Sequence, residues 1–183
     1  MKEKIYTQLS YNYHDQNSLY GTSPFLAKQS TAFAQTYWTK QINLNNDFLA
    51  GLAFKNLWFD DNTFITQSSD ALHNKPDNSN TLGLFLQNET TFDSAAKYKL
   101  LACLRLDYHE QYNLIPSPRL AFKWTPSCKF IVRLNAGTGF RIVNVFTEDH
   151  MALTGAREVV FVNTINPETS YNASLNMIYK MKL

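Results

Sequence analysis

The sequence predicts an all-β fold, an antiparallel up-and-down meander of about eight strands. Three observations predict it: apolar and polar residues alternate along most segments, aromatic residues are abundant, and short links alternate with long ones. The chain has 183 residues, of which 44% are hydrophobic, 14% aromatic and 17% charged, and these proportions fit a folded domain. The best helical candidate, residues 148–156, is too short to count as more than a helical turn.

The strands follow from a two-residue period. In the first expected strand, residues 5–14, Ile5 and Leu9 lie on one face and Gln8 on the other. The same period returns in residues 100–109, 119–124, 130–137 and 170–179. Three further segments are apolar enough for strands, although the first two do not show which face is apolar. These are residues 31–42, 48–59 and 82–92.

The lengths of the links indicate the topology. Long links are expected at residues 16–30, 60–80 and 141–168, an intermediate one at 110–116, and tight turns at 43–46, 93–97 and 125–127. In a meander, alternate links lie at opposite ends of the sheet, so the tight turns share one end and the longer links share the other. Outer-membrane barrels have this layout, with short periplasmic turns and long extracellular loops.

Alternation alone does not say which face points inward. A soluble lipocalin-like barrel, a binding module, turns its apolar face inward, whereas a membrane barrel turns it toward lipid. Two groups of residues favour the membrane barrel. One consists of charged residues deep in the strands, and the other of aromatic residues near the strand ends. The charges are Arg105, Asp107 and Arg133, and the aromatic residues are Tyr11, Tyr13, Tyr108, Trp124, Tyr171 and Tyr179. A partial transmembrane β-barrel is therefore predicted, and a lipocalin-like barrel with Leu104, Leu120 and Val132 inside is the alternative.

Several function classes find no support. The formal net charge is +2 and the basic residues are scattered, which argues against a nucleic-acid partner. The sequence contains no GxSxG, HExxH or P-loop motif, so we expect neither an enzyme nor a cofactor. Cys103 and Cys128 are interpreted as isolated packing residues, because no CxxC or Cys/His spacing surrounds them. The potential metal ligands at residues 148–150 are expected in a solvated loop, so no metal site is predicted.

A succession of short motifs is more specific than any one of them. In order they are GLFLQNE (83–89), LLACLRLDYHEQY (100–112), SPRLAFKWTP (117–126), GTGFR (137–141), VFTEDHMALTGAREVV (145–160) and NPETSYNASLNMIY (166–179). This order resembles the barrels of TonB-dependent outer-membrane receptors. The resemblance covers about residues 83–179, and the segment before it agrees in strand pattern with weaker motifs.

The resemblance implies TonB-coupled uptake of a scarce nutrient, such as a ferric siderophore or cobalamin, across a cell outer membrane. Members of this family are receptors for transport, with a barrel of about 22 strands plugged by an N-terminal domain. They perform no covalent chemistry on the ligand. The implied partners are outer-membrane lipid, the plug domain, the TonB energy-coupling complex and the small-molecule nutrient.

We expect residues 1–183 to be an internal fragment of the barrel domain, without a signal peptide or plug. About eight strands are expected where the family has about 22, so the chain alone should neither close a full-size barrel nor transport. Its first and last strands are expected to be open edges.

The candidates for contact with ligand or plug are Arg105, Asp107, Arg119, Arg133, Arg141 and Arg157. Arg141 follows two glycines where a strand meets the longest link, and glycines allow a bulge or a close backbone approach. It is expected to be either a clamp or a rim arginine in water. Arg157 is expected in the loop, where it would attract an anionic ferric chelate. His109 lies at a strand end, where a polar side chain needs no special role.

Overall fold

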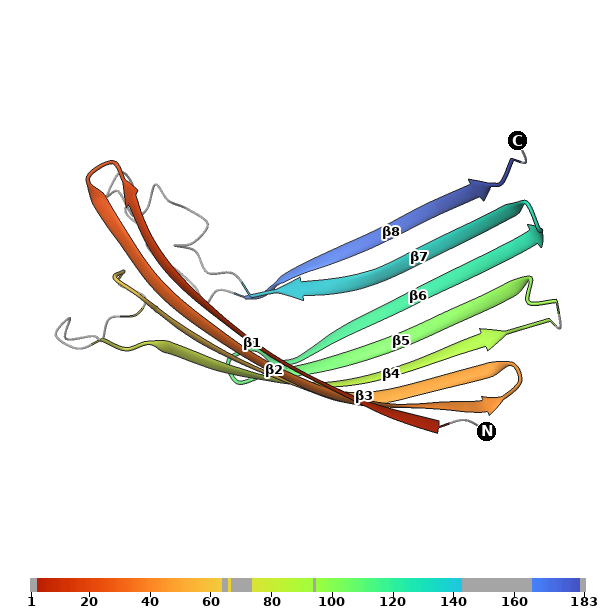
Figure 1. Cartoon of the computed structure of the whole chain (residues 1–183), viewed down its shortest axis with the longest axis horizontal. Helices are drawn as coiled ribbons and strands as arrows, with labels where there is room; N and C mark the ends of the chain where they lie inside the picture. The colour runs from red at the N-terminus through yellow and green to blue at the C-terminus, as the bar shows by residue number, and fades with distance from the viewer. Residues whose placement is uncertain (1–2, 64–65, 67–73, 94, 143–165, 182–183) are drawn as a thin grey trace.

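Eight long strands form one continuous antiparallel sheet (Figure 1). The computed structural model describes residues 3–63, 66, 74–93, 95–142 and 166–181. The strands are β1 (Glu3–Tyr20), β2 (Ser23–Asn43), β3 (Asn46–Asp61), β4 (Asp77–Thr91), β5 (Tyr98–His109), β6 (Asn113–Ser127), β7 (Phe130–Arg141) and β8 (Glu168–Tyr179). The all-β meander predicted from the sequence is confirmed.

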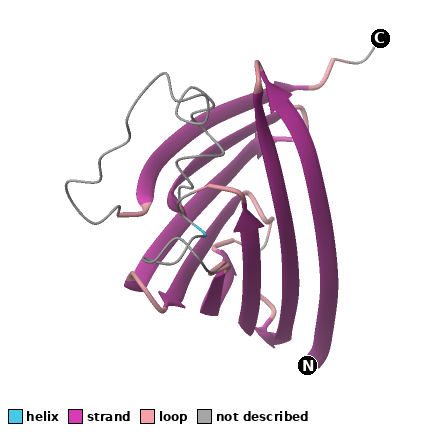
Figure 2. Cartoon of the chain, turned by 90° about the vertical axis from the view of Figure 1, so that its left-hand side faces the viewer, coloured by secondary structure: helices cyan, strands magenta, loops and turns pink. Residues whose placement is uncertain are grey.

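The sheet is open. Each strand pairs with its neighbours in the chain, in the order β1 to β8, and within the described ranges no pairing joins β1 to β8. Figure 2 shows the strands curving around an open trough. The open edges expected from the sequence are therefore present. No helix among the described residues is both long and apolar enough to cross a membrane.

The links alternate between the two ends of the sheet as predicted, but two predicted lengths are wrong, because the links expected at residues 16–30 and 110–116 cover only residues 21–22 and 110–112. The three tight turns lie at the end that carries both termini (Figure 1). The first link is not a long loop at residues 16–30, because β1 continues to Tyr20 and β2 begins at Ser23. Gly21 turns the chain with a φ of +64°, a conformation that glycine adopts without strain. The polar residues of this segment extend a hairpin instead of forming a loop.

β6 is also longer than predicted, since it begins at Asn113 and includes Pro116 and Pro118. The two-residue period predicted this strand only from residue 119, and prolines are unusual inside a strand because they lack the N–H that a ladder needs. The β5–β6 pairing nevertheless continues to His109↔Asn113, whereas the β6–β7 pairing stops at Arg119↔Gly137. We call the unpaired stretch, β6 residues 113–118 and β7 residues 138–141, the seam. Figure 1 shows β6 and β7 diverging toward this end.

Two smaller boundaries also move. β4 begins at Asp77 rather than at residue 82, so the link before it covers residues 62–76. The turn expected at residues 125–127 lies at residues 128–129, because β6 continues to Ser127. Turns at 44–45 and 92–97 agree with prediction, as does the long link at 142–167.

The register assigns the faces of every strand, including β2 and β3. Cross-strand pairs such as Leu84↔Leu106 and Leu134↔Leu175 place apolar residues together on the convex face. Its exposed members include Leu9, Leu52, Phe54, Leu82, Leu104, Leu120, Leu134, Leu175 and Met177. The concave face carries Arg105, Asp107, Arg119 and Arg133, as expected of residues that face ligand or plug, together with Lys123. A lipocalin-like barrel requires the opposite arrangement, so that alternative is not favoured.

Aromatic side chains form two belts on the convex face. The first belt, near the tight turns, consists of Trp38, Phe48, Tyr98, Trp124, Phe130 and Tyr179. The second, toward the long links, consists of Tyr13, Trp58, Tyr108 and Tyr171. On one strand the belts are about eight to ten residues apart, which spans about 20–24 Å for a strand tilted by about 45°. Outer-membrane barrels carry an apolar band about 25 Å tall between aromatic girdles.

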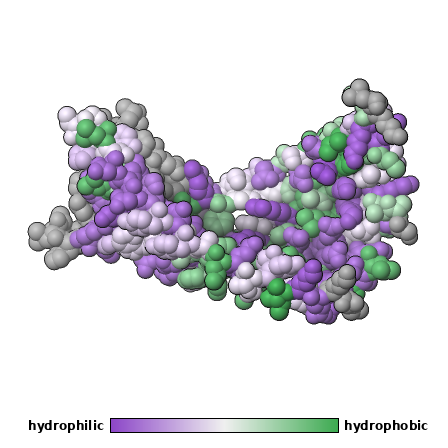
Figure 3. Space-filling view, viewed as in Figure 1, coloured by the Kyte–Doolittle hydropathy of each residue, from purple (hydrophilic) through white to green (hydrophobic). Residues whose placement is uncertain are grey.

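A small core lies on the concave side of the sheet, between the β1–β2 hairpin and β3. Phe25, Ala27 and Phe59 are buried there, with Tyr20 packed against them. Asn62, at the start of the β3–β4 link, makes two hydrogen bonds to the backbone of β2. Its Oδ1 accepts from the Leu26 N–H at 2.9 Å, and its Nδ2 donates to the Pro24 carbonyl at 2.9 Å. In the space-filling view, hydrophilic residues predominate at this end of the molecule (Figure 3).

Candidate functional site

A cavity of about 1060 Å³ lies on the concave face, in the half of the sheet toward the long links. Side chains of β2 to β7 form its wall. Pockets for small ligands usually measure about 300–1,000 Å³, so this cavity has room for a bulky one. Four predicted candidates line it, namely Arg105, Asp107, Arg119 and Arg141.

The charge of the wall is mainly positive. Its cationic residues are Lys55, Lys75, Arg105, Arg119 and Arg141, and its carboxylates are Asp77 and Asp107. Arg105 pairs with Asp107, and Arg141 pairs with Glu168. Among the described residues, no ion pair involves Lys55, Lys75 or Arg119. These three cations, opposed by the carboxylate of Asp77, leave the cavity with an excess of positive charge.

Arg105 and Asp107 form a bidentate pair along β5. Arg105 Nε and Nη2 donate to the two carboxylate oxygens of Asp107, each at 2.7 Å. Asp107 is fully buried, whereas the Arg105 side chain keeps 37% of its surface exposed. The guanidinium carbon lies 5.9 Å from the centre of the Phe85 ring. This geometry holds the guanidinium in one orientation at the cavity wall.

His109 contradicts the expectation of a solvated strand end, because only 2% of it is exposed and it lines the cavity. Its Nδ1 accepts a hydrogen bond from the Gln111 backbone N–H at 3.2 Å, and its ring stacks on Tyr112 at 5.0 Å between centroids. Burial raises the pKa of Tyr112, and the carboxylate of Asp77 raises it further. The phenol in the β5–β6 link is therefore a neutral hydrogen-bonding group at neutral pH.

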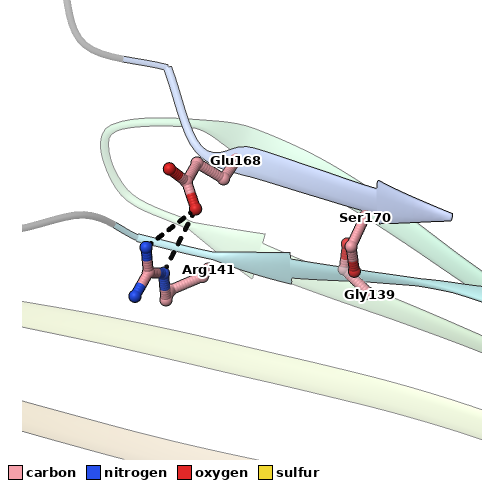
Figure 4. Close-up of polar contacts among 4 residues, drawn as sticks. All are labelled: Gly139, Arg141, Glu168 and Ser170. Carbon is pink, nitrogen blue, oxygen red and sulfur yellow. Dashed lines mark hydrogen bonds and ion pairs between the residues drawn. The ribbon is translucent and has the colours of Figure 1, made fainter. Parts of the chain in front are cut away.

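Arg141 lies at the rim. Its Nη2 and Nε donate to Glu168 Oε2 on the adjacent strand at 2.9 and 3.2 Å (Figure 4). Both side chains are more than half exposed, so the pair is a rim contact between β7 and β8. The possible bulge is absent, because the β7–β8 register runs without a shift to Arg141↔Glu168. Gly137 instead permits a close approach, since a Cβ there would lie 2.9 Å from Arg119 Cγ and 3.2 Å from the Pro118 carbonyl oxygen.

Arg133 does not reach the cavity. It lies lower on the concave face, opposite Lys123 and Asn176 in the register. Lys123 in turn faces Lys99, whose ammonium pairs with Glu89 at 2.6 Å. Arg157 lies outside the described residues, as do residues 148–150 and the predicted helical turn.

The wall chemistry is that of an anion-binding site. Guanidinium and ammonium groups form charge-assisted hydrogen bonds with carboxylate, catecholate or phosphate oxygens. Among the described residues, no group of His, Cys, Asp and Glu is arranged to hold a metal ion. Cys103 and Cys128 are free thiols, so the prediction that they are isolated is confirmed, but Cys128 is exposed between β6 and β7 and is not the packing residue that was expected.

Comparison with known proteins identifies the family. The family model described as "TonB dependent receptor-like, beta-barrel" matches residues 3–181. The chain belongs to this family. The concave face is therefore the lumenal wall of a TonB-dependent receptor barrel, and the cavity lies in that wall. The match also extends the resemblance to the first three strands, whose motifs were weak.

Two solved receptors share the arrangement of strands. The sheet is similar to the siderophore receptor PirA from Pseudomonas aeruginosa, with a TM-score of 0.68 and 14% identity over 98% of this chain and 37% of PirA. It is also similar to a point mutant of PfeA, the ferric enterobactin receptor of the same organism, with a TM-score of 0.59 and 14% identity over 79% of this chain and 23% of PfeA. The chain thus spans well under half the length of these receptors. A comparison with curated protein sequences found no match.

Proposed function

We propose that the chain forms part of the wall of an outer-membrane receptor that binds an anionic ferric siderophore and takes it up with energy from TonB. The observation that carries this proposal is the cationic cavity in the lumenal wall. The similarity to PirA and PfeA, whose names specify a siderophore and ferric enterobactin, supports the same ligand class. No covalent step on the ligand is proposed.

The charge of the cavity favours a ferric siderophore over cobalamin. A ferric catecholate carries net negative charge, so Lys55, Lys75 and Arg119 would attract it before contact. Cobalamin is close to neutral and gains less from the same field. The cavity is also lined by Phe33, Phe85 and Tyr112, which offer flat surfaces to aromatic catecholate rings.

The convex face supports placement in the outer membrane. Its leucines and phenylalanines are exposed in the isolated sheet, and lipid would cover them. The spacing of the two aromatic belts corresponds to the thickness of an outer-membrane apolar band. Trp and Tyr are favoured at such boundaries because one part of each ring system is apolar and another is polar.

Further strands and a plug complete the proposed receptor. Unpaired backbone groups are costly in lipid, so β1 and β8 need partner strands before the sheet is stable in a membrane. Arg133 and Lys123 face each other as like charges on the lumenal side, which is unfavourable without a compensating anion. An acidic surface of a lumen-filling plug, coupled to TonB, would supply that anion. That residues 1–183 neither contain the plug nor transport alone stays a prediction.

Fractionation and ligand binding test the proposal. We expect the native protein in the outer-membrane fraction, and we expect it to bind ferric enterobactin more tightly than cobalamin. Reversing cavity charges in Lys55→Glu and Arg119→Glu should weaken ferric enterobactin binding by at least about tenfold. The matched control is Lys28→Glu, on the convex face of β2, which changes the net charge equally. Recovery in the soluble fraction, or equal loss in the control, would contradict the proposal.

A further inference from the structure

The bidentate pair of Arg105 and Asp107 lies directly over a glycine of the neighbouring strand. A Cβ built on Gly83 would lie 2.6 Å from Asp107 Oδ1 and 2.9 Å from Arg105 Nη2. Real Cβ atoms do not approach other atoms this closely, so any other residue at position 83 would displace the pair. Gly83 pairs with Asp107 in the register, and Phe85 pairs with Arg105.

Three contacts therefore fix the guanidinium. Asp107 holds its Nε and Nη2 edge, the Phe85 ring lies 5.9 Å from its central carbon, and Gly83 leaves the space beneath it. Asp107 is fully buried and accepts from Arg105 with both carboxylate oxygens. A long arginine side chain normally loses rotamer entropy on binding, and here that loss has already occurred on folding.

The fixed guanidinium retains unused donors. Arginine has N–H groups on all three nitrogens, and Asp107 accepts from Nε and from one N–H of Nη2. Nη1 makes no hydrogen bond among the described residues. Arg105 lines the cavity and is partly exposed, so these free donors are available to a molecule that enters.

We propose that Arg105 is the pre-organised oxyanion-binding residue of this cavity, and that Asp107 and Gly83 are positioning residues that set its orientation. This inference rests on the proposed function and assigns its anion recognition to one residue. The ligand group is a carboxylate or catecholate whose oxygens accept from the free Nη1 and Nη2 edge. Lys55 and Arg119 attract the ligand over a longer range, whereas Arg105 determines how its oxyanion is oriented.

The test uses the receptor purified from outer membranes, with ferric enterobactin as the anionic probe and cobalamin as the neutral one. Arg105→Lys keeps the charge and removes the planar fork, so binding of ferric enterobactin should fall by about 10- to 100-fold. Arg133→Lys is the matched control, because Arg133 shares the concave face but lies outside the cavity. It should leave binding within about twofold.

Gly83→Ala separates orientation from charge. It removes no charged group and displaces the Arg105–Asp107 pair, so ferric enterobactin should bind at least about fivefold more weakly. The control is Gly139→Ala, whose new Cβ would come no closer than 3.3 Å to Ser170 Oγ. In Asp107→Asn the guanidinium loses its anchor. Its effect and that of Arg105→Lys should not add in the double variant, because both act through one group.

Each outcome is decisive. Selective weakening by Arg105→Lys and Gly83→Ala, with both controls unchanged, supports the assignment. Ferric enterobactin binding by the unaltered receptor with no more weakening in Arg105→Lys than in Arg133→Lys would overturn it and leave the proposed function intact. Should Arg105→Lys fail to fold, Gly83→Ala decides by the same comparison. An unaltered receptor that binds no ferric chelate would overturn the proposed function and this inference together.

Discussion

Close packing across the sheet makes one glycine sensitive to any side chain. A Cβ on Gly51 would collide with the Phe85 ring and lie 2.7 Å from Tyr37 Cβ. Gly51→Ala should therefore destabilise the fold by about 1–3 kcal/mol, the usual cost of overpacking. Denaturant titration of the refolded protein in lipid vesicles measures this, with Gly139→Ala as control. Equal stability of the two variants would show that the ring moves aside without loss.

The sequence predicted residue positions well where a two-residue period holds. It placed Arg105, Asp107 and Arg119 on the concave face, and the register confirms this placement. It missed Lys55 and His109, although both line the cavity. The period in residues 48–59 did not show which face is apolar, and the position of a strand end does not show whether a loop covers it. These contacts depend on the curvature of the sheet, which no local pattern contains.

At the scale of strands, the seam is a predicted weak point. The amides of residues 138–141 that point toward β6 have no ladder partner, whereas residues 132–137 of β7 are paired on both sides. We expect hydrogen exchange at these seam amides to be at least about tenfold faster, because unpaired amides exchange without local unfolding. Residue-resolved exchange in micelles measures it. Uniform protection along β7 would mean that β6 and β7 are hydrogen-bonded to their ends.

The two faces of one strand should differ in how much an added charge destabilises the protein. Leu120 points outward from β6 and Ala121 points into the lumen. Leu120→Lys should destabilise the protein in vesicles by about 2–4 kcal/mol, the cost of a cation near the middle of the bilayer. Ala121→Lys should cost less than about 1 kcal/mol, because the lumenal side is solvated. If Ala121→Lys costs as much as Leu120→Lys, the assignment of faces is wrong.

Strand number, order and alternate link positions were predictable, while strand ends were not. Residues 16–30 contain Gly21, Pro24 and many polar residues, a composition typical of a loop. They form strand because Phe25 and Ala27 pack against Phe59 of β3 in the small concave core, a contact that the local composition does not show. Pro116 and Pro118 concealed the start of β6 for a different reason. A proline is tolerated where the ladder to the neighbouring strand is interrupted. Such an interruption depends on how two strands pair, so the sequence of one strand does not show it.

For the whole molecule, the open edges predict self-association. β1 and β8 each present a row of unpaired backbone groups over twelve or more residues. The chain purified alone in detergent should therefore form oligomers through edge pairing. Sedimentation in density-matched detergent measures the mass. A stable monomer with outward-pointing amides of β1 and β8 protected from exchange would show that eight strands close into a small barrel.

The central claim is that lipid covers the convex face and water or ligand occupies the concave one. The most direct measurement is a nitroxide scan of β5 from Leu100 to Tyr108 in the protein reconstituted in lipid, with the native cysteines replaced. Oxygen, which concentrates in lipid, should relax labels at even-numbered positions most, and a water-soluble nickel chelate should relax those at odd-numbered positions, including 105 and 107. The opposite phase, or no alternation, would contradict the account.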